Sequence, residues 1–151
     1  MKRYAPKLKI LPMSFQAEAL RKYRDTISVV VGGPCVLLWR GRVMPAEYTD
    51  AYEIEVNYRT DTSLVPRPKV FVTRPLLQSR DGVGCPHRHG DQEPCVYYHP
   101  GNEWRPDMLL AHTIVPWASR WLYFYEIWLA TGQWMGGGIP HEPKVPLRRA
   151  L

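Results

Sequence analysis

The pattern of hydrophobic and polar positions predicts short strands in the first half of the chain. Residues 51–58, AYEIEVNY, alternate strictly between apolar or aromatic side chains and polar ones, which is the period of a strand with one buried face. Residues 27–43 are rich in β-branched and apolar side chains but are broken by GGP at 32–34, and residues 69–77 form a third strand-like stretch. The short connections between these stretches favour an antiparallel meander.

Helical periodicity appears before and after the predicted strands. Ser14 can cap a helix that runs to about Asp25. The apolar positions at helical spacing, expected on its packed face, are Phe15, Ala19, Leu20 and Tyr23. Residues 106–131 predict two helical pieces separated at Pro116, with Gly132 as the C-cap.

A stripe of large side chains follows Pro116 at helical spacing. Its members are Trp117, Trp121, Tyr125, Trp128 and Leu129. Such a stripe is typical of a core-facing helix surface, and a cofactor-binding aromatic box is the alternative. Between strands and helices, residues 75–106 show almost no periodicity, and a loop of this length in a compact domain is usually functional. The order of elements predicts an α+β domain.

Composition adds bounds to this picture. A chain of 151 residues with 45% apolar residues predicts a single folded domain over residues 1–151. Residues 1–13 and 139–151 are expected to be extended tails. The 15 prolines indicate short elements and many loops.

Charge and cysteine content point to a cytoplasmic protein. The formal net charge of +6 is concentrated near the two ends, which suits solubility or an acidic protein partner better than a nucleic-acid surface with interleaved aromatics. No run reaches the roughly 20 apolar residues of a membrane span. Three cysteines without a recognisable signal peptide indicate reduced thiols. A homodimer is left open.

The long loop offers two chemistries. Cys85, His87, His89 and Cys95 are residue types that bind zinc, and His99 follows them closely. Their spacing in CPHRHGDQEPC, however, lacks the two short Cys-x-x-Cys-like pairs that are typical of zinc sites. An extended chain would place His87 and His89 on one side. Ordinary hydrogen bonding within the loop is the alternative for both histidines.

The second chemistry is a thiol nucleophile. Cys95 could equally be a small buried apolar residue, but histidines and arginines near it in sequence are groups that can favour a thiolate. Cys35 lies in the apolar stretch PCVLLW and is expected to be inert core. Cys85 shares the loop, so a resolving or ligating role is open for it.

These residues resemble the ubiquitin-conjugating enzyme family. VPRPKVFV (65–72) is similar to the proline-rich entry to the last strand, and HGDQEPCVYYHPGNEWRPDMLL (89–110) is similar to the catalytic cysteine followed by a Trp-x-Pro helix start. The resemblance implies a fold with an N-terminal helix, a four-stranded meander, a catalytic loop and C-terminal helices. It also implies that Cys95 forms a thioester and that Trp104 and Pro106 are structural.

Residues 87–138 resemble a narrower group, the stand-alone bacterial conjugating-like proteins of anti-phage CBASS operons. This resemblance implies that Cys95 transfers an acyl group to a lysine amine, without a cofactor. The implied donor and partner is a cyclic GMP–AMP synthase-like nucleotidyltransferase, and a separate activating enzyme is a further candidate partner.

One departure from the conjugating-enzyme pattern affects the catalytic residues. The family's His-Pro-Asn motif before the cysteine is replaced by CPHRHG, so no asparagine matches and His87 can hold only the place of the motif histidine. The candidates for proton transfer and oxyanion stabilisation are His87, His89, Asp91 and His99. Two rival functions remain: an inactive module that docks a nucleotidyltransferase, and a zinc-binding protein.

Overall fold

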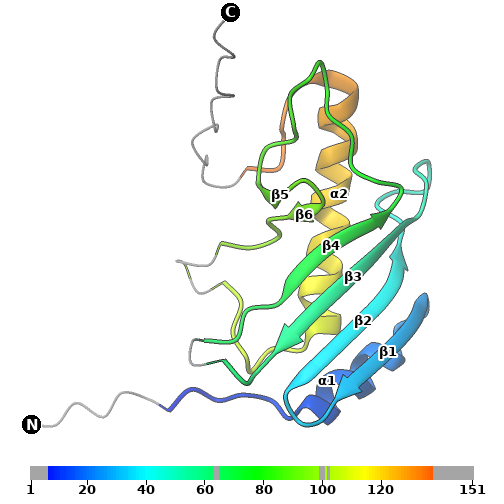
Figure 1. Ribbon diagram of the computed structural model, residues 1–151. Coiled ribbons are helices and arrows are strands. Elements are labelled where there is room, and N and C mark those ends of the chain that lie inside the picture. Colours follow the sequence, from blue (N-terminus) through cyan, green and yellow to red (C-terminus); the bar gives the residue numbers. More distant parts are fainter. Residues whose placement is uncertain (1–6, 63–64, 99–100, 102, 138–151) are drawn as a thin grey trace, which may run out of the picture.

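The computed structural model describes residues 7–62, 65–98, 101 and 103–137. In chain order, its elements are α1 (Met13–Arg21), β1 (Thr26–Gly32), β2 (Val36–Val43), β3 (Tyr52–Arg59), β4 (Lys69–Arg74), β5 (Arg88–Gly90), β6 (Glu93–Pro94), the short 3₁₀ helix η1 (Leu110–His112) and α2 (Ile114–Thr131). Figure 1 shows this order from the blue N-terminal helix to the yellow and orange α2. The α+β class expected from the sequence is confirmed.

Within the described residues, β1 to β4 form an antiparallel sheet in sequential order. The register aligns Val29, Trp39, Val56 and Val70 in one row across it, so the alternation seen in the sequence becomes one buried face. Residues 27–43 are a hairpin of two strands, and Gly33 has a φ of +61° in its turn. That left-handed conformation suits glycine, which has no Cβ to clash.

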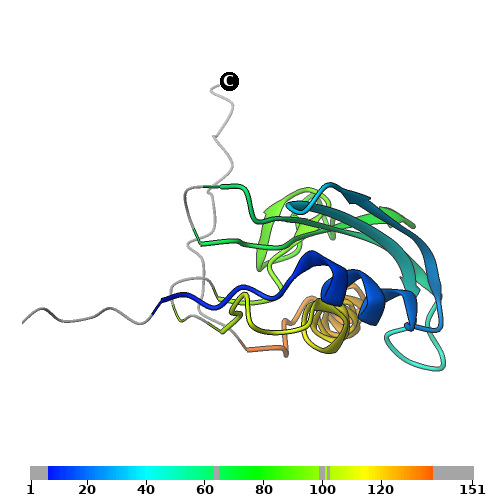
Figure 2. The same ribbon diagram turned by 90° about the horizontal axis from the view of Figure 1, so that it is seen from below.

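The domain has two layers. Figure 2 shows α1 and α2 side by side on the same face of the sheet. The buried apolar residues of the described chain form a single core between these layers, in which Trp39 from β2 and Leu122 from α2 are fully buried. No helix in the described ranges is long and apolar enough to cross a membrane.

The first helix begins earlier than expected and buries a different face. Pro12, with an extended ψ of 142°, directly precedes it, and Ser14 is an exposed residue within it and not its cap. Phe15, expected in the packed face, is 57% exposed, whereas Gln16 is fully buried. Gln16 donates to the Met108 carbonyl (2.8 Å) and accepts from the Leu110 amide (2.9 Å), so the buried face is decided by a long-range contact.

The second helix is continuous through Pro116, so the expected division there is wrong. Pro116 lies in the first turn of α2, where a missing N–H leaves no intrahelical hydrogen bond unmade. The expected C-cap is confirmed, because Gly132 has a φ of 79° and its amide donates to the Trp128 carbonyl at 2.7 Å. Trp121, Tyr125 and Trp128 are buried as expected, while Trp117 and Leu129 are only partly buried.

The loop over residues 75–106 is more ordered than its sequence suggests. It contains the β5–β6 hairpin, and the Val72 amide of β4 donates to the Gln92 carbonyl at 2.8 Å. Its preceding part is tied to α2, because the Gln78 amide donates to the Tyr125 hydroxyl at 2.8 Å. Cys35, expected within a strand, lies just before β2 in the hairpin turn and is half-buried.

The expected tails fall mostly outside the described residues. Met13 is already helical and residues 7–12 form no regular element, while residues 139–151 and the first six residues lie beyond the described ranges.

Candidate active site

Cys95 follows β6 directly and is held by its neighbours on both sides. Its amide donates to the His87 carbonyl at 2.8 Å, and its thiol donates to the Tyr97 carbonyl at 3.2 Å. The residue is half-buried. Since Gln92, the residue before β6, accepts a hydrogen bond from Val72 of β4, the edge of the sheet helps to fix the position of the sulfur.

Burial raises the pKa of the Cys95 thiol above its ordinary value. The hydrogen bond with the Tyr97 backbone lowers this pKa in part, and the carboxylates of Glu103 and Glu93 raise it further. A neutral thiol is therefore the dominant form at pH 7. Two arginines that flank Cys95 in sequence pair with other groups: Arg88 with Asp91 and Arg105 with Asp107, each at 3.1 Å. These two arginines are close to Cys95 in sequence, but their charges are compensated by carboxylates. The thiol therefore has fewer uncompensated cations around it than the sequence suggests.

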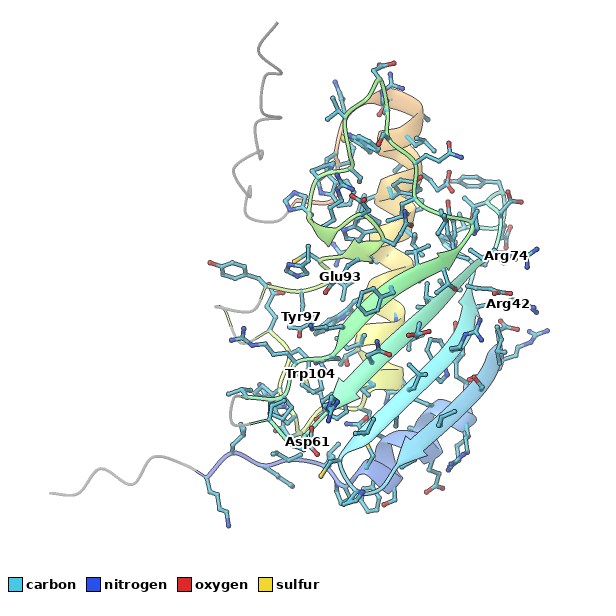
Figure 3. The ribbon with its side chains drawn as sticks, in the orientation of Figure 1. Arg42, Asp61, Arg74, Glu93, Tyr97 and Trp104 are labelled. Atoms are coloured by element: carbon cyan, nitrogen blue, oxygen red, sulfur yellow. The ribbon has the colours of Figure 1, made fainter. Side chains whose placement is uncertain are left out.

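A cavity of about 620 Å³ opens beside Cys95. Its described lining residues are His87, Cys95, Val96, Tyr97, Tyr98, Glu103, Trp117, Arg120, Trp121, Phe124, Trp134, Gly136 and Gly137. They come from the loop, from α2 and from the segment after α2. Figure 3 shows Glu93, Tyr97 and Trp104 one after another beside β4, on the side where the loop approaches α2. The cavity can hold several residues of an extended peptide next to the sulfur.

His87 lies in the cavity wall and shapes the turn before the cysteine. Its carbonyl accepts from the Cys95 amide at 2.8 Å and from Trp121 Nε1 at 2.9 Å. Its φ is +57°, in the left-handed region that a residue with a side chain rarely adopts. Its ring lies 5.2 Å from the ring of Trp134. Of the predicted residues in the described loop, His87 and Cys95 are the two that line this cavity.

The other predicted loop residues lie elsewhere. Asp91 pairs with Arg88, and both line a separate polar cavity of about 200 Å³ together with the buried Cys85. His89 is exposed and lines neither of the two cavities. His99 lies outside the described residues.

The zinc set Cys85, His87, His89 and Cys95 falls wholly within the described chain, and there no three candidate ligands come together to hold a metal ion. The physical reason is that the chain does not continue as an extended strand through His87, where the positive φ turns it. The structure therefore offers no support for the zinc alternative from these residues.

Trp104 and Pro106 are both buried. Trp104 Nε1 donates to Thr113 Oγ1 at 3.2 Å, and its ring meets Tyr58 edge-on with centroids 5.4 Å apart. The Pro106 carbonyl accepts from the Leu11 amide at 3.0 Å. These contacts join the end of the loop to β3, to the start of α2 and to the segment before α1, as suits a structural role.

The sequence reasoning missed several residues of the cavity wall. Glu103 directly precedes the Trp-x-Pro segment, for which the sequence predicts a structural role. Arg120 and Phe124 lie on a helix whose apolar stripe was assigned to the core, and Trp134 lies beyond its end. Trp117 belongs to the predicted stripe, yet it is only partly buried and lines the cavity. Its spacing in the sequence does not distinguish it from the buried members of the stripe.

A helix, a four-stranded antiparallel meander, a loop cysteine and a long helix behind it give the described part of this chain an E2-like fold, the fold of the ubiquitin-conjugating enzymes. A family model described as "Type II CBASS E2 protein" matches residues 16–142. The chain belongs to this family, which acts in CBASS anti-phage signalling. The match spans Cys95 and the whole described cavity wall. Comparison with curated proteins gives no match.

Proposed function

We propose that Cys95 carries an acyl group as a thioester and passes it to a lysine amine during anti-phage defence. The observation that carries this proposal is the position of Cys95 in the wall of the 620 Å³ cavity, in a chain of the CBASS E2 family. Cys85 is the weaker candidate, because it is buried and its pKa is raised to about 12 by desolvation. A thiol in that state is inert near neutral pH.

The proposed donor is the C-terminus of a cyclic GMP–AMP synthase-like nucleotidyltransferase from the same defence system. An extended C-terminal segment fits a cavity that several aromatic side chains line together with Gly136 and Gly137. A free carboxylate does not condense with a thiol unaided, so the donor must arrive as an activated acyl group. The enzyme that activates it is a further proposed partner.

Transfer then proceeds in one addition and one elimination. The amine attacks the thioester carbonyl, the C–N bond forms, and the C–S bond breaks to release the Cys95 thiolate, which takes a proton from the nitrogen. The tetrahedral oxyanion needs N–H donors. Among the described residues with side-chain N–H groups, His87, Arg120 and three tryptophans line this cavity. We propose His87 for the role because its carbonyl accepts from the Cys95 amide and so holds the two residues together.

The test is to express the Cys95→Ser chain in its native host beside Cys95→Ala and Cys85→Ser chains, and to record native and denaturing intact masses. Because an oxygen ester outlives a thioester, we expect a protein-sized adduct on Cys95→Ser and on the wild type, none on Cys95→Ala, and a retained adduct on Cys85→Ser. The adduct mass also identifies the donor.

Two other results would point elsewhere. Bare masses for every variant would favour an inactive docking module. An adduct that survives Cys95→Ala and disappears with a Cys85 substitution would remove Cys95 from the role.

A further inference from the structure

Two carboxylates lie near the Cys95 sulfur, but they occupy different places. Glu93 is on β6 and half-buried, whereas Glu103 is exposed on the chain segment before Trp104. Both raise the pKa of the thiol, so both carboxylates act on it electrostatically. Among the described residues, Glu103 is the acidic side chain that lines the cavity.

The Glu103 carboxylate is held in place from two sides. Its Oε2 accepts from the Tyr98 amide at 2.7 Å, a short bond of the charge-assisted kind. The next residue, Trp104, is buried and bonded to Thr113, which anchors the backbone. A carboxylate has about four lone-pair sites, so one bond to an amide leaves acceptor capacity for an ammonium group.

The cavity is also lined by a residue of the opposite charge. Arg120 of α2 lines the same cavity, with its guanidinium carbon 5.7 Å from the centre of the Phe124 ring. A cationic group entering the cavity is attracted by the Glu103 carboxylate and repelled by the Arg120 guanidinium. The acceptor in the proposed reaction, a lysine, arrives at neutral pH as such a cation.

We propose that Glu103 binds the ammonium of the acceptor lysine and directs it onto the acyl group carried by Cys95. This inference rests on the proposed function. The ammonium gives one proton through the carboxylate to solvent, and the neutral amine attacks the thioester carbonyl. The C–N bond forms, the C–S bond breaks, and the second proton goes to the departing Cys95 thiolate. Glu103 thereby selects an amine over water as the acceptor.

The test uses the full chain acylated at Cys95 with a short glycine-ending peptide benzyl thioester, the site being checked by peptide mass spectrometry. Transfer is measured with Nα-acetyl-lysine amide and, separately, with hydroxylamine, a nucleophile that is uncharged at pH 7.5. The variants are Glu103→Gln and Glu93→Gln. The second is the matched control, because it removes a carboxylate that acts on the same thiol but does not line the cavity.

For Glu103→Gln we expect the half-saturating lysine concentration to rise about fivefold, the size of an exposed ion pair. The hydroxylamine rate should not fall with it, and the lysine effect should shrink as salt is added. Glu93→Gln should leave the ratio of lysine to hydroxylamine rates at its wild-type value. Matching thermal midpoints for the three chains would show that folding is unaffected.

Either of two results overturns the role of Glu103 alone: an unchanged lysine dependence in Glu103→Gln, or the same loss in both variants, which would mean that the carboxylates act only through the thiol. A wild-type chain whose Cys95 accepts no acyl group overturns the proposed function itself, and the assignment of Glu103 with it.

Discussion

Cys95, the proposed nucleophile, lines the cavity but carries a thiol that its surroundings do not activate. Burial and two carboxylates favour its neutral form, whereas the described cations beside it in sequence are engaged in ion pairs. A thiolate of high pKa is a strong nucleophile once formed and a slow leaving group. A thioester on Cys95 is therefore expected to persist against a weak nucleophile such as water and to await a bound amine.

This reasoning predicts the pH dependence of Cys95 alkylation. Because the folded-state pKa lies above the ordinary thiol value, the thiolate fraction at any pH between 7 and 9 is lower than in an unfolded control. We expect the rate with iodoacetamide to keep rising above pH 9, and Glu93→Gln to move the curve to lower pH. Peptide mass spectrometry separates Cys95 from Cys35. A rate already at its plateau below pH 8 would contradict the prediction.

At the scale of elements, the packing of β2 depends on the close approach of the Trp39 ring to Gly41 in the same strand. Trp39 is fully buried, and its Nε1 donates to Thr26 Oγ1 at 2.9 Å. Its ring also meets Tyr23 edge-on, with centroids 5.6 Å apart. The ring lies across Gly41, where an added Cβ would come within 2.1 Å of Trp39 Cζ2. The sheet therefore needs the absence of a side chain at Gly41.

Gly41→Ala is expected to lower the free energy of unfolding by about 1–3 kcal/mol, the usual cost of overpacking a core, because the Trp39 ring is held from two sides and cannot turn away. Urea unfolding measures the change. Gly32→Ala is the control, since its Cβ would come no nearer than 3.4 Å, to Val36 Cβ, and we expect less than about 1 kcal/mol there. Equal losses in the two variants would argue against this role for Gly41.

At the scale of the whole molecule, the cavity exists because distant segments meet beside Cys95. The segment after α2 returns to the loop through Trp134, whose ring centre lies 5.2 Å from that of His87 and 5.4 Å from that of Trp121. Trp134 Nε1 donates to the Gly137 carbonyl at 3.0 Å, which folds this segment along the cavity. Trp134 thus joins the end of the described chain to the turn that holds the cysteine.

Removing this side chain should affect the site more than the fold. For Trp134→Ala we expect slower acylation of Cys95 and faster hydrolysis of its thioester, since the wall opens to water. The free energy of unfolding should fall by about 2 kcal/mol, less than for a fully buried tryptophan. Met135→Ala, which truncates an exposed neighbour in the same segment, should change neither rate. Indistinguishable acylation and hydrolysis rates in the two variants would show that Trp134 is not part of the site.

Much of the fold can be predicted from the sequence, because strands and helices have characteristic spacings of apolar residues. The alternation over residues 51–58 gives β3 and its buried face, and Gly132 ends α2 because left-handed backbone favours glycine. The order of elements together with the cysteine segment sufficed to identify the family, which the family match over residues 16–142 confirms. The choice of Cys95 as the nucleophile is a sequence-based prediction that the proposed adduct experiment tests.

Only the tertiary structure decided which residues of different elements come into contact, including those around Cys95. Gln16 is buried because its amide meets the backbone of residues 108 and 110, and His87 and His89 separate because the chain turns at His87. Glu103, Arg120 and Trp134 line one cavity although no short sequence period connects them. Periodicity reports how a residue relates to its own helix or strand, whereas a site is made by contacts between elements, and these depend on how the layers pack.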